Sequence, residues 1–206
     1  MKFVVIVEGD MEEAAIGPFL KRWLDPKLKA RVGVVPVKLR GTRFRRDLAG
    51  MARDQLSRDT RNEVIAVIGL CDLYQGADYP PEKTRVDERY EWGVRHFEDT
   101  VNINRFHMFF AVHETEAWFL SQPGALPRSV REKVPDAWSR APERVNFDNP
   151  PSKRLEGMYP RGYKKTTDGA NLLRELDPTA ARDKCPHLKL MLDTMLDLAK
   201  KALKEN

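Results

Sequence analysis

The sequence predicts an α/β fold, in which a mostly parallel sheet is flanked by helices. Two observations lead to this prediction. Short apolar, β-branched runs alternate with longer amphipathic segments over residues 1–121, and the apolar runs contain little polar–apolar alternation. Uninterrupted apolar runs are typical of strands buried on both faces, as happens when helices cover both sides of a parallel sheet.

The first half of the predicted core contains two strands and two helices. Residues 3–7 form an apolar run, and residues 11–24 place apolar side chains at helical spacing before Pro26 ends the helix. Residues 32–39 are the second predicted strand, and Pro36 favours an edge position or a bulge for it, because proline cannot donate to a central ladder. A second amphipathic helix is expected over residues 45–56.

The second half of the chain continues the alternation of strands and helices up to residue 121 and then becomes rich in proline. Strands are expected at residues 64–70 and 106–112, with a helix over 85–101 between them and a short helix over 114–120. Seven prolines between residues 122 and 163 allow only short helices and loops there. Order returns at residues 169–176, and an amphipathic helix covers residues 186–203. We therefore predict an α/β core at residues 1–121 and a Pro-rich, mainly helical extension at 122–206, packed together as a single compact unit.

Composition narrows the class of protein. No apolar stretch approaches the roughly 20 residues needed to span a bilayer, and the apolar start is too short and too quickly acidic for a signal peptide. Cys71 and Cys185 form no CxxC pair, which argues against a zinc site or a disulfide framework. The expected location is the cytoplasm, without membrane attachment.

Positive charge is concentrated in two segments. Lys38–Arg61 holds eight basic against three acidic residues, and Pro150–Lys165 holds five against one, whereas the whole chain has a net charge of +5. The rest of the chain is therefore net acidic. Two basic segments on an acidic body suggest a polyanionic partner such as nucleic acid. The alternative is that both are ordinary solvated surfaces.

Acidic residues follow three of the predicted strands. They are Glu8 and Glu12 after the first strand, Asp72 after the third, and Glu114 and Glu116 after the fourth. In a parallel sheet these positions meet at the carboxyl edge, where ligands bind. Gathered carboxylates repel one another, and a hard divalent cation such as Mg²⁺ or Mn²⁺ relieves that repulsion. Alternatively, the glutamates at residues 8 and 12 are there because the helix dipole favours acidic residues at a helix N-terminus, and the aspartate merely begins a turn.

Several segments carry a resemblance to a known family. The stretch VVIVEGDMEEAAIGPFL resembles the first TOPRIM motif, and its Glu-Gly-x-x-Glu form is like that of the overcoming-lysogenization-defect (OLD) nucleases. The stretch AVIGLCDLYQ resembles the second motif, Asp-x-Asp. The chain as a whole resembles the TOPRIM-like domain of unknown function numbered 4276, through VEGDMEE, CDLYQ, AVHETEAWF, NPPSKRLEGMYPRGYKK and RDKCPHLKLML.

The resemblance implies roles for the acidic residues. It implies acid/base chemistry or metal binding for Glu8, metal binding for Glu12 and Asp72, and a later acidic ligand at Glu114 or Glu116. It also implies an ATPase partner and a setting of phage defence. One position departs from the pattern, because Tyr74 stands where the second aspartate of Asp-x-Asp is expected. A two-ion site then lacks a usual ligand, unless one of the later glutamates replaces it.

The leading hypothesis is a metal-dependent phosphodiesterase or nuclease that acts on nucleic acid, with DNA as the expected substrate. Glu8, Lys153 and His113 are the candidate catalytic residues, although His113 at a strand end is also a common structural position. The candidate phosphate-binding residues are Arg43, Arg45, Arg46, Lys153, Arg154, Lys164 and Lys165. The basic residues have a plain alternative as solvated surface charges.

Two other functions stay open. A non-catalytic TOPRIM-like subunit that binds nucleic acid or an ATPase is favoured by Tyr74. The other is a hydrolase of small phosphorylated molecules. The sequence has no GxxxxGK[ST] segment, so an ATP-driven step requires a partner.

Overall fold

The computed structural model describes residues 1–39, 43–73, 79–145 and 149–205. Its centre is a sheet of four strands in the order β2-β1-β3-β4. Their bounds are Lys2–Val7 for β1, Gly33–Lys38 for β2, Val64–Asp72 for β3 and Phe106–Ala111 for β4. Every pairing is parallel, which confirms the predicted α/β fold. Strand β2 lies at an edge, as Pro36 predicts.

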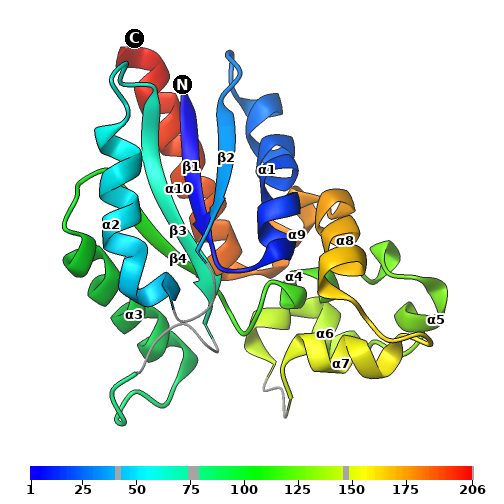
Figure 1. Ribbon diagram of the computed structural model, residues 1–206. Coiled ribbons are helices and arrows are strands. Elements are labelled where there is room, and N and C mark those ends of the chain that lie inside the picture. Colours follow the sequence, from blue (N-terminus) through cyan, green and yellow to red (C-terminus); the bar gives the residue numbers. More distant parts are fainter. Residues whose placement is uncertain (40–42, 74–78, 146–148, 206) are drawn as a thin grey trace.

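Four long helices cover the two faces of the sheet (Figure 1). They are α1 at Asp10–Leu24, α2 at Arg43–Ser57, α3 at Val86–Val101 and α10 at Pro186–Glu205. Alternate residues of β1 explain the arrangement: Phe3 and Val5 face a core shared with α1 and α10, whereas Val4 and Ile6 face one shared with α2 and α3. Both faces of the strand are buried, so its sequence is apolar throughout.

Short helices follow β4. They are α4 at Glu116–Leu120, α5 at Arg128–Arg131, α6 at Asp136–Arg140, α7 at Pro151–Met158, α8 at Ala170–Glu175 and α9 at Pro178–Lys184. Single tight turns lie between them or after α1: η1 at Asp25–Lys27, η2 at Pro123–Ala125, η3 at Pro142–Arg144, and a π-helical turn, η4, at Lys165–Gly169. Helices α5, α6 and α7 lie together to one side of the strand ends (Figure 1).

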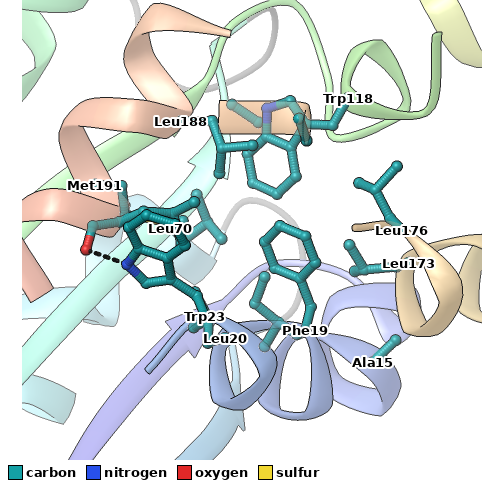
Figure 2. Close-up of a cluster of buried hydrophobic side chains, with 14 of the residues drawn as sticks. Ala15, Phe19, Leu20, Trp23, Leu70, Trp118, Leu173, Leu176, Leu188 and Met191 are labelled. Carbon is teal, nitrogen blue, oxygen red and sulfur yellow. Dashed lines mark hydrogen bonds between the residues drawn. The ribbon is translucent and has the colours of Figure 1, made fainter. Parts of the chain in front are cut away.

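One core joins residues from both predicted parts of the chain. Figure 2 shows the Trp118 ring facing Phe19, with centroids 5.9 Å apart. The indole N–H of Trp23 donates to the carbonyl of Leu192 in α10 over 2.9 Å, and Leu173 of α8 packs in the same cluster. The predicted boundary at residue 121 stays a prediction, although apolar contacts cross it. Among the described helices, none is both long enough and apolar enough to traverse a bilayer.

Candidate metal centre

Three carboxylates converge at the carboxyl ends of β3 and β4. One oxygen from each of Asp72, Glu114 and Glu116 lies within 4.8 Å of the others. Asp72 is the last residue of β3, and the two glutamates follow β4, which is its neighbour in the sheet. The parallel topology therefore produces the clustering expected from the sequence.

The backbone after β4 turns sharply and directs the glutamates to this point. His113 has a φ of 64°, a left-handed conformation that few non-glycine residues adopt. Helix α4 consequently begins at Glu116 rather than at Glu114, where the sequence analysis places its start. Glu114 and Glu116 stand on either side of Thr115, whose N–H faces Asp72. The turn thus ties the end of β4 to the end of β3.

Each carboxylate has one oxygen held by an uncharged donor. The three bonds run from the Thr115 N–H to Asp72 Oδ1 (3.1 Å), from the Ser152 N–H to Glu114 Oε2 (2.8 Å), and from the Tyr163 hydroxyl to Glu116 Oε1 (3.2 Å). Donors of this kind fix the orientation of a carboxylate and leave its second oxygen for a ligand. Two of them come from the segment after residue 150.

A single ammonium group lies among the three carboxylates. Lys165 Nζ is 3.6 Å from Asp72 Oδ2, 3.7 Å from Glu114 Oε1 and 3.3 Å from Glu116 Oε1. Burial alone would lower the pKa of Lys165, but the surrounding carboxylates raise it instead. The lysine is therefore a cation, and one positive charge stands against three negative ones.

The remaining negative charge is buried. Glu116 has no exposed surface, and its Oε2 has no hydrogen-bond partner among the described residues. Burial raises the pKa of Glu116 to about 7, against the opposing charge of Lys165, and repulsion from Glu114 and Glu12 adds to the rise. Burial also raises the pKa of Asp72 well above its usual range. A buried oxygen without a partner, within an all-oxygen donor set, fits a hard divalent cation.

Glu8 and Glu12 line a cavity of about 330 Å³ that also reaches Asp72 and Lys165. Burial raises the pKa of Glu8, and the negative charge of Glu12 raises it further. A Cβ at Gly9 would overlap Glu12 Oε2, so a larger residue there would displace the Glu12 carboxylate. The structure thus brings together all five acidic residues that the sequence singles out at the three strand ends.

The fold brings some of the predicted phosphate-binding residues close to the acidic centre and leaves others exposed on the surface. Lys165 lies at the acidic centre. The positive charge of Arg45 is near enough to Glu8 to oppose part of the rise in the pKa of that residue. Lys153 pairs with Glu156 over 2.8 Å on the exposed side of α7, although its charge also interacts with Glu114. Lys164 is exposed.

Arg154 and Arg46 make contacts with residues outside the three carboxylates. The Arg154 guanidinium lies over the ring of Trp138, 5.8 Å from its centroid. Arg46 pairs with its neighbour Asp47 over 2.7 Å. The side chain of Arg43 and the whole of Tyr74 lie outside the described residues.

His113 faces away from the acidic centre. It lines a different cavity, together with Glu143 of η3 and with His187 at the start of α10. Burial lowers the pKa of His113, so its imidazole is neutral near pH 7. The same left-handed turn that presents Glu114 to Asp72 places His113 in this second cavity. His113 is therefore not among the groups that surround the three carboxylates.

Two groups in the centre escape prediction from sequence patterns. The Ser152 N–H is a backbone donor, which no side-chain pattern can indicate. Tyr163 reaches Glu116 from 47 positions further along the chain. The one signal that covers both is the segment NPPSKRLEGMYPRGYKK, which contributes to the family resemblance and contains Lys165 as well.

Comparison with known proteins gives one family match. The model of the family described as "Domain of unknown function (DUF4276)" matches residues 7–196. No curated protein matches the sequence significantly.

Two solved structures are similar in fold over almost the full length. The C-terminal region of the Burkholderia pseudomallei OLD protein is 18% identical, with a TM-score of 0.47, and the match covers 95% of this chain and 96% of that one. The C-terminal region of the Xanthomonas campestris pv. campestris OLD protein is 15% identical, with a TM-score of 0.45, covering 99% and 97%.

Proposed function

The chain belongs to the DUF4276 family, and we propose that this member is a divalent-cation-dependent phosphodiesterase, a nuclease of TOPRIM type. Asp72, Glu114 and Glu116 would hold Mg²⁺ or Mn²⁺, and Glu8 and Glu12 line the cavity that Asp72 also reaches. The observation that carries the proposal is a buried oxygen of Glu116, which lies beside two further carboxylates and has no hydrogen-bond partner within the described part of the chain. A hard cation is the ligand that such a group accepts best.

The chemistry divides between the cation and the protein. When bound, a divalent cation would supply charge neutralisation at the phosphate and activation of a water molecule. Glu8 would accept the proton of that water, and the rise in its pKa, through burial and the charge of Glu12, supports this role. Lys165 would then stabilise the negative charge that develops on the phosphate oxygens.

Lys165 has two positions in this scheme. In the cation-free protein its ammonium lies where the three carboxylates converge. A divalent cation at the same point would repel it, and its flexible side chain would move towards the phosphate. Lys165 is the first residue of the π-helical turn η4, and turns of this kind occur frequently at functional sites.

A prediction for Lys165 separates cation binding from catalysis. Lys165→Met removes the competing charge while keeping the length of the side chain, so Mn²⁺ should bind about threefold more tightly or better. Cleavage should fall by about 100-fold, because a charge-stabilising donor is lost. Mn²⁺ titration and a cleavage assay measure the two effects. An exposed lysine of α10 provides the control, Lys201→Met, which should change neither; weaker Mn²⁺ binding by Lys165→Met would contradict the scheme.

The proposed substrate is nucleic acid, with DNA expected. Arg45 interacts electrostatically with Glu8, and Lys153 with Glu114. These charges suit a polyanion that reaches beyond a single phosphate. We propose action together with a separate ATPase, in a cytoplasmic setting such as phage defence.

A second candidate function is a non-catalytic subunit that binds nucleic acid or an ATPase. Lys165 favours it, because an internal cation already neutralises part of the acidic centre, and so does Tyr74 in the second motif.

One experiment separates the candidates. The protein is incubated with single-stranded, double-stranded and supercoiled DNA, and with a small phosphodiester, each in Mn²⁺ and in EDTA. Cleavage of DNA only in Mn²⁺ supports the nuclease. Binding without cleavage supports the non-catalytic subunit, and cleavage of the small ester alone supports a small-molecule hydrolase.

A further inference from the structure

We propose that Tyr163 is a positioning residue of the acidic centre, which fixes the orientation in which Glu116 presents its carboxylate to the cation, and that Gly169 is required to keep the tyrosine in place. The inference rests on the proposed function, because it concerns the same centre. It adds two residues to which neither the acidic motifs nor the family resemblance assigns a role.

The tyrosine hydroxyl holds one oxygen of the Glu116 carboxylate. Tyr163 Oη donates to Glu116 Oε1 over 3.2 Å. The other contact to the same oxygen is the Lys165 ammonium, at 3.3 Å. Glu116 Oε2 is buried and has no partner among the residues that the structure describes. With Oε1 held by the hydroxyl, the plane of the carboxylate is fixed, and so is the direction from which an ion meets its oxygens.

The bond gains importance when a cation arrives. Lys165 and a divalent cation compete for one location, so the lysine contact to Oε1 is lost on binding. The hydroxyl of Tyr163 is uncharged and is not repelled by the ion. It therefore remains as the donor that keeps Glu116 in its orientation, in the way that outer groups orient metal ligands elsewhere.

Gly169 holds the tyrosine hydroxyl by leaving room for it. A Cβ at Gly169 would overlap both Tyr163 Oη and Met11 Sδ. The backbone of Gly169 has φ −63° and ψ −44°, which any residue adopts. Space, rather than backbone conformation, therefore requires glycine. Met11 of α1 closes the other side, with its sulfur 3.8 Å from the hydroxyl.

The neighbouring tyrosine provides a matched control. The ring of Tyr159 lies 5.4 Å from that of Tyr163, at an interplanar angle of 56°. Its hydroxyl makes no hydrogen bond among the described residues. Tyr159→Phe and Tyr163→Phe thus remove the same atom from two adjacent aromatic side chains, and only the second removal breaks a contact with Glu116.

The test measures Mn²⁺ binding by titration, with thermal unfolding in EDTA as a check on the fold. Tyr163→Phe should weaken Mn²⁺ binding by about 10-fold or more, within the range known for groups that orient metal ligands. The unfolding temperature in EDTA should match that of Tyr159→Phe, which should bind Mn²⁺ like the wild type. A purely structural tyrosine would instead lower the unfolding temperature and leave the affinity unchanged.

Gly169→Ala supplies a second route to the same effect. The added methyl group should displace the hydroxyl from Glu116, since the end of a side chain moves more easily than a helix, and Mn²⁺ binding should weaken although Tyr163 is still present. In the double variant with Tyr163→Phe, the alanine should add little further loss, because both changes remove one interaction.

The outcomes are distinguishable. Wild-type Mn²⁺ binding together with unchanged affinity in Tyr163→Phe would overturn the positioning role and leave the proposed function intact. Independent, additive losses from the two substitutions would overturn the part assigned to Gly169. Absence of Mn²⁺ binding in the wild type would overturn the proposed function, and this inference with it.

Discussion

Glu8→Gln and Asp72→Asn are each expected to reduce Mn²⁺-dependent DNA cleavage by at least about 100-fold. For Glu8 the reason is the loss of a proton acceptor, which commonly contributes 10²–10⁴-fold. For Asp72 it is the loss of an anionic ligand, Oδ2, which faces the point where the three carboxylates converge. Initial rates on supercoiled DNA in Mn²⁺ measure both effects.

Both variants are expected to fold. The two carboxyl groups have raised pKa values because they are buried, so the cation-free site already favours a neutral side chain at these positions. A matched control is Glu132→Gln, since Glu132 is exposed and pairs only with Arg128 among the described residues. It should cleave like the wild type. Undiminished cleavage by either site variant would show that the proposed centre does not carry the activity.

Glu116→Gln is expected to change thermal stability with opposite signs in EDTA and in Mn²⁺. The pKa of Glu116 is raised from 4.5 to about 7 in the folded protein, chiefly by burial. The folded state therefore binds more protons than the unfolded state between these values, and the stability that this confers is lost as the pH rises from about 4.5 to about 7. At pH 8 in EDTA the ionised carboxylate destabilises the fold.

Glutamine removes that charge. At pH 8 in EDTA, the unfolding temperature of Glu116→Gln should exceed that of the wild type by about 3 °C, equivalent to roughly 1 kcal/mol for a chain of this size. Well below pH 4.5 the difference should vanish, because Glu116 is then protonated in both the folded and the unfolded state. Scanning calorimetry at several pH values in EDTA measures the difference.

Mn²⁺ should reverse the order. At 100 times its dissociation constant, Mn²⁺ would stabilise the wild type by about 2.7 kcal/mol, or about 5–10 °C. Glu116→Gln, which lacks one anionic ligand, should gain much less, whereas Glu132→Gln should gain as much as the wild type. Equal stabilisation of the site variant and the wild type by Mn²⁺ would exclude Glu116 as a ligand.

The amino-acid sequence by itself determined the order of strands and helices and the edge at which the acidic residues gather. Periodicity suffices for this, because a strand buried on both faces must be apolar throughout and parallel strands all end at one edge. Glu8 directly follows β1, Asp72 is the last residue of β3, and Glu114 lies three residues after the end of β4. The edge position of β2 follows equally from Pro36, since a missing N–H is a local property.

Only the tertiary structure decided which other side chains reach those acids. Seven basic residues were equal candidates in the sequence, but the fold brings Lys165 into contact with three carboxylates and leaves Lys164 exposed, although the two are adjacent. The left-handed turn at His113 decided that the histidine and Glu114 face different cavities. Contacts of this kind depend on turn geometry and on packing between segments roughly 40 or more positions apart, and periodicity does not encode either.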